Sequence, residues 1–224
     1  MNKNRLEAFS DGVLAIIITI MVLELKTPHE ASWEALRPLL PVLVSYALSF
    51  VFVGIYWGNH HHLFQAVERV NGTVLWLNMH LLFWLSLIPF GTAWMAETHF
   101  ATLPVFVYGC MLLGAGIAFT LMARCLVAIH GKESLLATLL GNSQAAPIRT
   151  PRGGIDSDLK GKISTGLYGS ALVLVWLNTW IAYAIYIAVA LLWIMPDRRI
   201  EAMLEEVGRA KAKGSGGKLR GRRK

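Results

Sequence analysis

The side chains best suited to chemistry stand at the edges of long apolar runs, and the first of them is Asp11. It precedes residues 12–23, among which Thr19 is the sole polar side chain. A carboxylate near the hydrocarbon of a bilayer costs roughly 2.5 to 3.5 kcal/mol unless it faces protein or water. We therefore expect Asp11 to point at a partner inside the protein, and we treat it as a candidate functional residue.

The segment that follows Asp11 has a stripe of four residues on one face of a helix: Ile16, Thr19, Ile20 and Leu23. At about 100° per residue, Asp11 lies about 140° round from Ile16, so the acid and the stripe face different neighbours. Such a stripe is most often buried against other helices. A narrow ring of apolar side chains can also gate ion flow by dewetting, and a hydroxyl can replace part of an ion's water. The pattern alone leaves both uses open.

Three consecutive histidines, His60, His61 and His62, follow Trp57 and suggest an integral membrane enzyme that uses a metal. Zinc sites need about four convergent ligands, whereas adjacent residues of a helix point about 100° apart. The chain has no His-Glu-x-x-His or Cys-x-x-Cys motif. We therefore expect neither a metal site nor an enzyme, and keep the metal-dependent enzyme as an alternative. A proton-coupled transporter around Asp11 is another alternative, although the inverted repeats that it predicts are not visible in the sequence.

The composition places these residues in a membrane. Of 224 residues, 55% are hydrophobic and 16% are charged, whereas soluble domains carry about 25% charged residues. The net charge of +7 lies mainly in loops and the C-terminal tail, where it reports membrane topology. We therefore expect the lipid bilayer, and no nucleic acid, as a partner. Cys110 and Cys125 lie 15 positions apart on one expected helix, too far to form a disulfide within the chain.

The apolar runs predict an all-α integral membrane protein with six transmembrane helices in one domain, residues 1–196. Pro89 is expected to kink the third helix. Residues 163–195 leave room for two short helices, since a spanning helix needs about 17 to 25 residues. An even number of spans puts both termini in the cytoplasm, where the basic tail of residues 197–224 fits the usual excess of Lys and Arg. The expected spans are residues 5–25, 38–58, 73–93, 103–129, 163–177 and 180–195.

Two groups of residues in the first helix carry a resemblance to a known family. They are Arg5-x3-Phe9-Ser10-Asp11-Gly12 and Ala15-Ile16-x2-Thr19-Ile20-x2-Leu23-Glu24-Leu25. This helix resembles the first helix of the prokaryotic transmembrane-protein-175 family, relatives of the lysosomal and endosomal potassium channel. The resemblance implies a homotetramer in which four first helices line a central pore. It also implies a hydrophobic constriction at Ile16, a hydroxyl layer at Thr19 linked to potassium preference, and a further apolar layer at Leu23.

The same resemblance implies an interhelical polar network. Members of the family share a Trp-x-x-His-His element after the second helix, with hydrogen bonds from it to the arginine and aspartate of the first helix. A network of this kind satisfies a buried carboxylate, because tryptophan donates one N–H and histidine donates or accepts. A third consecutive histidine extends the pattern in this chain, so the histidine that bonds the first helix stays open. The candidates are Trp57, His60, His61, Arg5, Asp11 and, on the third helix, Asn78.

Residues and resemblance together predict a potassium-preferring cation channel in the inner (plasma) membrane, opened and closed at the apolar rings of the first helix. The sequence lacks the Thr-Val-Gly-Tyr-Gly loop of ordinary potassium filters, so side chains would have to select the ion. No cofactor is expected besides the permeant potassium ions. The expected partners are further copies of the chain, lipid and monovalent cations.

Overall fold

The structure is a computed structural model that describes residues 2–131 and 157–194. All regular structure within these ranges is helical, which confirms the expected all-α class. The predicted basic tail, residues 197–224, lies outside the described residues. The helices are α1 (Lys3–Leu23), α2 (Trp33–Leu36), the short 3-10 helix η1 (Arg37–Leu39), α3 (Leu40–Gln65), α4 (Gly72–Ser86), α5 (Ile88–Glu97), α6 (Thr102–His130), α8 (Ser157–Leu174) and α9 (Thr179–Ile194).

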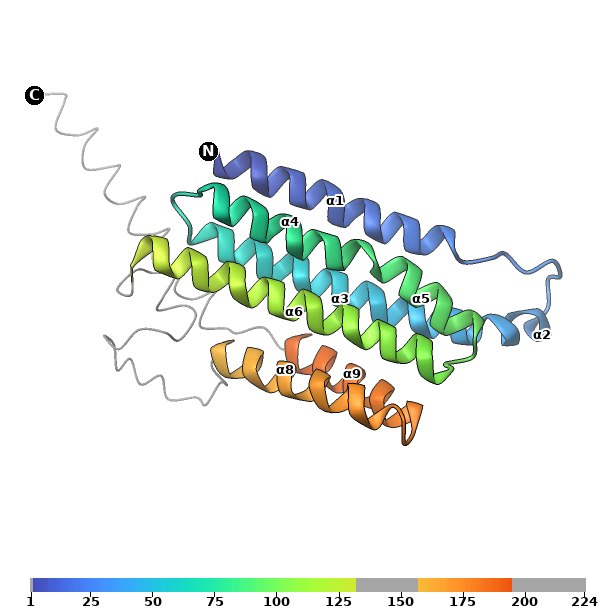
Figure 1. The fold of residues 1–224 in the computed structure, drawn as a ribbon. Coiled ribbons are helices and arrows are strands. Elements are labelled where there is room, and N and C mark those ends of the chain that lie inside the picture. The colour runs from blue at the N-terminus through green and yellow to red at the C-terminus, as the bar shows by residue number, and fades with distance from the viewer. Residues whose placement is uncertain (1, 132–156, 195–224) are drawn as a thin grey trace, which may run out of the picture.

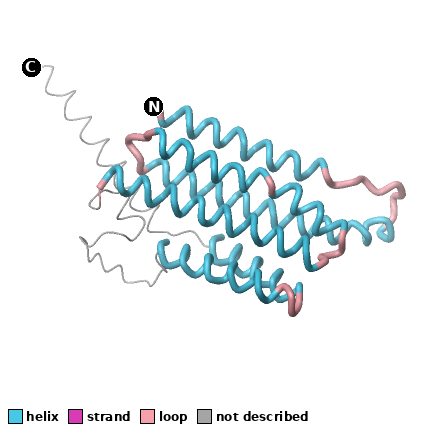
Figure 2. Tube along the Cα trace, viewed as in Figure 1, coloured by secondary structure: helices cyan, strands magenta, loops and turns pink. Residues whose placement is uncertain are grey.

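The long helices lie side by side as an elongated bundle (Figures 1 and 2). α1 runs along one edge and packs against α3, α4 and α5. The hairpin of α8 and α9 lies along the opposite edge, where α8 packs against α6 and α9 against both α3 and α6. Among the described helices, α1 therefore has neighbours on one side only.

Local sequence signals account for several helix ends. The side chain of Asn2 accepts a hydrogen bond from the amide of Asn4 at the start of α1, and Asn71 accepts one from the amide of Val74 at the start of α4. Asparagine is a favoured residue at this position because its side chain satisfies an otherwise unpaired amide. Gly131 follows α6 with a φ of 89°, a left-handed conformation that a residue without a Cβ adopts readily. The polar and glycine residues between apolar runs therefore set where these helices begin and end.

The expected third span, residues 73–93, consists of two helices that meet at Leu87. α4 ends at Ser86 and α5 begins at Ile88, one residue before Pro89. Proline lacks an amide hydrogen and its ring clashes with the carbonyl four residues earlier, so a continuous helix cannot pass through it without bending. The break thus lies two residues before the predicted kink.

Four helical segments of the described residues are long and apolar enough to cross a membrane: Lys3–Leu23, Trp33–Gln65, Gly72–Glu97 and Thr102–His130. Helix α9 is apolar but shorter, with 16 residues, and α8 has 18. At about 1.5 Å per residue these two helices are about 24 and 27 Å long, slightly less than the roughly 30 Å of a hydrocarbon core. The α8–α9 hairpin is therefore shorter along the helix axes than the four long segments.

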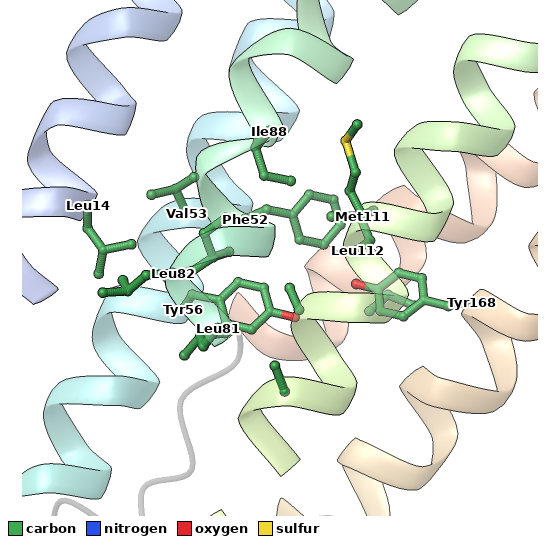
Figure 3. Packing of buried hydrophobic residues seen from close by; sticks show 14 of the residues in the cluster. Leu14, Phe52, Val53, Tyr56, Leu81, Leu82, Ile88, Met111, Leu112 and Tyr168 are labelled. Carbon is green, nitrogen blue, oxygen red and sulfur yellow. The ribbon is translucent and has the colours of Figure 1, made fainter. Parts of the chain in front are cut away.

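The core contains both apolar and hydroxyl side chains. Figure 3 shows residues of α1, α3, α4, α5, α6 and α8 meeting in one cluster, with Leu14 at one side and Tyr168 at the other. Within this core the Ser49 hydroxyl lies 2.6 Å from Thr92 Oγ1 and 2.8 Å from the Tyr108 hydroxyl. Buried hydroxyls need such partners, because an unpaired one costs about 1 to 3 kcal/mol. These bonds join α3, α5 and α6.

Candidate pore helix and its polar anchor

Helix α1 divides its side chains between two faces. Leu6, Leu14, Ile17 and Met21 are buried against the rest of the bundle. All four residues of the predicted constriction lie on the other face and are exposed, among them Ile16 at 58% and Leu23 at 79%. A continuous exposed apolar face of this kind marks a surface that meets lipid or protein. The prediction that this face lines a pore needs further copies of the chain around it.

Thr19 is the polar member of the exposed face. Its hydroxyl donates a hydrogen bond to the carbonyl of Ile16 across 2.8 Å. The hydrogen of the hydroxyl is therefore used within the helix, and the lone pairs of Oγ1 remain as acceptors. A hydroxyl in this state can offer oxygen to a cation but has no hydrogen directed at it.

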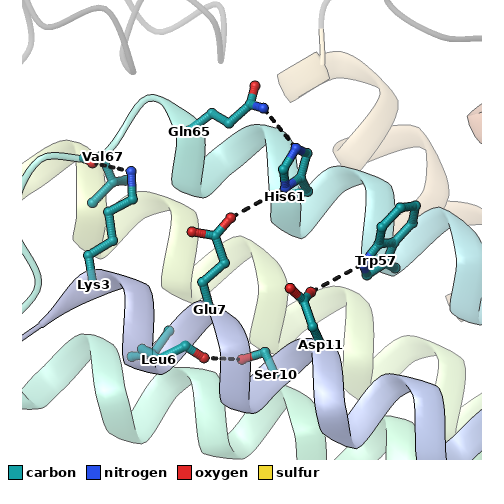
Figure 4. Close-up of polar contacts among 9 residues, drawn as sticks. All are labelled: Lys3, Leu6, Glu7, Ser10, Asp11, Trp57, His61, Gln65 and Val67. Atoms are coloured by element: carbon teal, nitrogen blue, oxygen red, sulfur yellow. Dashed lines mark hydrogen bonds and ion pairs between the residues drawn. The ribbon is translucent and has the colours of Figure 1, made fainter.

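Asp11 is held by α3 and not by the exposed face. The indole Nε1 of Trp57 donates a hydrogen bond to Asp11 Oδ1 across 3.1 Å (Figure 4). The carboxylate lies away from Ile16, as the helical spacing predicts. Asp11 thus anchors α1 to its own bundle and leaves the stripe face uncovered.

A second rung stands one helical turn away from this bond. Glu7 precedes Asp11 by four residues and His61 follows Trp57 by four, and His61 Nδ1 lies 3.3 Å from Glu7 Oε1 (Figure 4). The other ring nitrogen of His61 lies 2.7 Å from Gln65 Nε2. Residues four apart lie on one face of a helix. Because α1 and α3 run antiparallel, the contact between Asp11 and Trp57 therefore also brings Glu7, one turn earlier in α1, next to His61, one turn later in α3. Sequence reasoning missed Glu7 and Gln65, although this spacing was available as a signal.

A buried chain of three polar side chains joins α1, α4 and α3. Asn78 Nδ2 donates to Ser10 Oγ across 2.9 Å, and Asn78 Oδ1 lies 2.9 Å from His60 Nε2. The Ser10 hydroxyl already donates to the carbonyl of Leu6, so it must accept from the amide of Asn78. The oxygen of Asn78 then faces His60, and His60 must carry its proton on Nε2. The backbone carbonyl of Leu6, which can only accept, therefore sets the direction of every hydrogen bond in this series.

The structure also distinguishes among the remaining predicted residues. All three histidines lie inside α3, which continues to Gln65, and not after the second helix as expected, because Leu63 and Phe64 beyond them are buried and extend the packed face of the helix. Two of them face different neighbours: His60 faces Asn78 and His61 faces Glu7.

Arg5 makes no hydrogen bond or ion pair to any described residue; it is exposed, as is Phe9. Within residues 2–131 and 157–194, no three His, Cys, Asp or Glu side chains converge as metal ligands would.

Comparison with known proteins identifies the family. The family described as "Endosomal/lysosomal potassium channel TMEM175" matches residues 5–89, which include the stripe and its anchor. A protein from Chryseobacterium sp. (strain P1-3), named a potassium channel, is 48% identical over 206 residues, covering 92% of this chain and 100% of the relative. This chain belongs to the TMEM175 family.

Other TMEM175 relatives extend the comparison. A protein from Streptomyces collinus, also named a potassium channel, is 37% identical over 131 residues, or 53% of this chain and 62% of the relative. A crystal structure of a lysosomal potassium-selective channel TMEM175 homolog from Chamaesiphon minutus superposes with a TM-score of 0.68 at 26% identity, covering 86% of this chain and 96% of that one. Together with the long apolar helices, membership of TMEM175 shows that the chain is a membrane protein.

Proposed function

We propose that this TMEM175 chain is a potassium-preferring cation channel whose pore is lined by the α1 helices of several copies. The observation that carries the proposal is the division of α1 into an anchored face and an exposed stripe. The bond from Trp57 to Asp11 orients the helix, so Ile16 points away from its own bundle. The names of the relatives, potassium channel in each of the two bacterial sequences, support the choice of ion.

The side chains of the stripe suit a gated path for a cation. Ile16, Ile20 and Leu23 offer no group that could replace an ion's water, so a narrow ring of them would exclude ions by dewetting. Thr19 breaks the apolar run with an oxygen whose lone pairs are available. A ring of Thr19 hydroxyls would supply part of the coordination that a partly dehydrated potassium ion loses. Conduction then requires the apolar rings to widen.

The assembly that fits this arrangement is a homotetramer. Helix α1 lies along an outer edge of the bundle (Figure 1), and its stripe is exposed, so one chain cannot enclose a path alone. Residues 1–196 would form the channel domain, with α8 and α9 as the fifth and sixth spans. Both termini would then lie in the cytoplasm, with the protein in the inner membrane. The partners are lipid, permeant monovalent cations and the other subunits, and no cofactor or catalytic residue is needed.

Flux through purified protein tests the proposal. The full chain is reconstituted into liposomes loaded with potassium, and the release of potassium is compared with the release of sodium under the same gradient. We expect release above that of protein-free liposomes, faster for potassium than for sodium. Native mass spectrometry of the same preparation should give four times the mass of the chain. Liposomes as tight as the protein-free control, with the tetramer present, would remove the channel assignment.

A further inference from the structure

The α3–α4 loop, residues 66–71, touches the ends of two helices that are distant in the sequence. Two of its residues, Val67 and Val70, are buried. The carbonyl of Val67 accepts a hydrogen bond from Lys3 Nζ, at the start of α1, across 2.9 Å (Figure 4). The next two amides, of Glu68 and Arg69, both donate to Nε2 of His130, the last residue of α6, and each lies 3.2 Å from it. Three consecutive loop residues thus connect α1 to α6.

These contacts define the protonation of the His130 ring. Nδ1 lies 2.9 Å from the carbonyl of Leu126, which can only accept, so Nδ1 carries a hydrogen. Nε2 accepts hydrogen bonds from two backbone amides, which can only donate, so Nε2 carries no hydrogen and presents its lone pair. A ring with hydrogens on both nitrogens would direct an N–H at two other N–H groups. Only the neutral ring fits the loop in this position.

Among the described residues, the acceptor of these two amides is the His130 ring and not a charged group. Helix α4, which packs along α6, has no titratable side chain in residues 72–79. Among the described side chains, the remaining elements packed at this end carry two carboxylates, Glu68 of the loop and Glu7 of α1, and Glu7 lies against His61. The cations there are Arg69 of the loop, Lys3 and Arg5 of α1, Arg124 of α6, and Lys160 and Lys162 of α8. The lone pair of His130 is therefore what holds the two amides.

We propose that His130 is a positioning residue for α1. Its neutral ring holds the α3–α4 loop where the carbonyl of Val67 accepts the hydrogen bond from Lys3 Nζ, and acid on the side of the membrane where the N-terminus lies releases the loop. The inference rests on the proposed function, because it matters for conduction only if α1 lines the pore. Since the held loop excludes a second proton from the ring, release takes up one proton and is favoured as pH falls. A released loop leaves the base of α1 freer to move, so acid on this side raises potassium flux.

Amide exchange tests the loop independently of conduction. Hydrogen–deuterium exchange of the full chain in nanodiscs is measured at pH 7.5 and 5.5, with rates corrected for the intrinsic effect of pH. We expect the protection of Glu68 and Arg69 to fall about fivefold or more in acid, the scale of a typical coupling between sites. His130→Gln, whose carbonyl accepts but does not titrate, should keep protection at both pH values, and His130→Leu should lose it at both. Equal protection in wild type and His130→Leu would overturn the proposal.

Flux separates this proposal from the proposed function. Acidifying the side of the N-terminus should raise potassium flux of the wild type about fivefold or more, and His130→Gln should abolish that response. Lys3→Met should abolish it too while the exchange of the loop stays sensitive to pH, because this variant cuts the link to α1 alone. His29→Gln, a change at an exposed histidine elsewhere, is the control and should respond as wild type does.

The outcomes differ for the two claims. Absence of potassium flux at either pH contradicts the pore itself, and with it the coupling, whatever the exchange data show. Flux that responds to acid equally in wild type and His130→Gln contradicts the role of His130 and leaves the pore intact. Loss of the response in His29→Gln as well would also count against His130.

Discussion

Trp57 Nε1 lies 3.1 Å from Asp11 Oδ1, so the carboxylate of the first helix is satisfied by a neutral donor on α3 and not by a cation. The charge of Asp11 is therefore stabilised in place without being cancelled. Because the bond joins two helices near one end of the bundle, it also sets the rotation of α1 about its own axis. Together with the Glu7–His61 and Ser10–Asn78 contacts and the buried apolar residues of α1, this bond fixes which face of α1 meets the bundle.

Removing the carboxylate should loosen α1. Asp11→Ala leaves the Trp57 N–H without its partner, and we expect a loss of about 1 kcal/mol or more, typical of a hydrogen bond to a charged group. The oligomer peak in detergent should shrink and the melting temperature should fall. Asp11→Asn keeps an acceptor oxygen and is the control, with a smaller loss. A melting temperature of Asp11→Ala equal to that of wild type would show that the bond does not hold α1.

A polar side chain in the exposed apolar stripe of α1 should increase ion flux through the proposed pore. Ile16→Asn places an amide in the exposed apolar face, so a ring of such residues would hold water where the wild type excludes it. We expect potassium flux from liposomes to rise several-fold at an unchanged amount of tetramer. Ile181→Asn changes an exposed isoleucine of α9 and serves as the control, with flux like that of wild type. An equal rise in both variants would indicate general leakiness of damaged protein and speak against a pore at Ile16.

Removing the hydroxyl of the stripe should weaken ion preference. Thr19→Ala deletes the oxygen whose lone pairs remain free in the structure. We expect the ratio of potassium to sodium flux to fall by about 2- to 10-fold, equivalent to about 0.5 to 1.5 kcal/mol for one net hydrogen-bond-like interaction. Thr19→Ser retains the oxygen and should keep most of the preference. A ratio that is the same in all three proteins would exclude Thr19 from selection.

A glycine of α6 is needed for close packing of α4. A Cβ added to Gly114 would lie 2.4 Å from Cδ2 of Trp84, whose Nε1 is held by His80. Gly114→Ala should therefore destabilise the chain by about 1 to 3 kcal/mol, as overpacking of a core does. Gly116→Ala is the matched control on the same helix, where the nearest atom, the Tyr56 hydroxyl, is 3.7 Å away. It should be neutral or gain up to about 1 kcal/mol from helix propensity. Thermal melts in detergent compare the two, and equal melting temperatures would contradict this packing.

Several features of the fold and site were predictable because they depend on local sequence. The alternation of apolar and polar residues at a period of about 3.6 predicts which residues share a face of α1. It placed Asp11 away from Ile16, and the structure has both residues on those separate faces. The apolar runs also predicted the helical class, since a chain in lipid must satisfy its backbone within each segment.

The partners of the polar residues were decided by the tertiary structure. The contacts of His60 with Asn78 and of His61 with Glu7 depend on how far α3 is shifted along α1 and α4. The spacing of residues within one helix contains no information about that shift. The contact of the α3–α4 loop with His130 joins residues more than 60 positions apart and depends on where α6 ends. The sequence by itself thus determined which side chains share a face of each helix, because that follows from helical spacing. Only the packing of the helices decided which faces meet, because register between helices arises from contacts across the whole core.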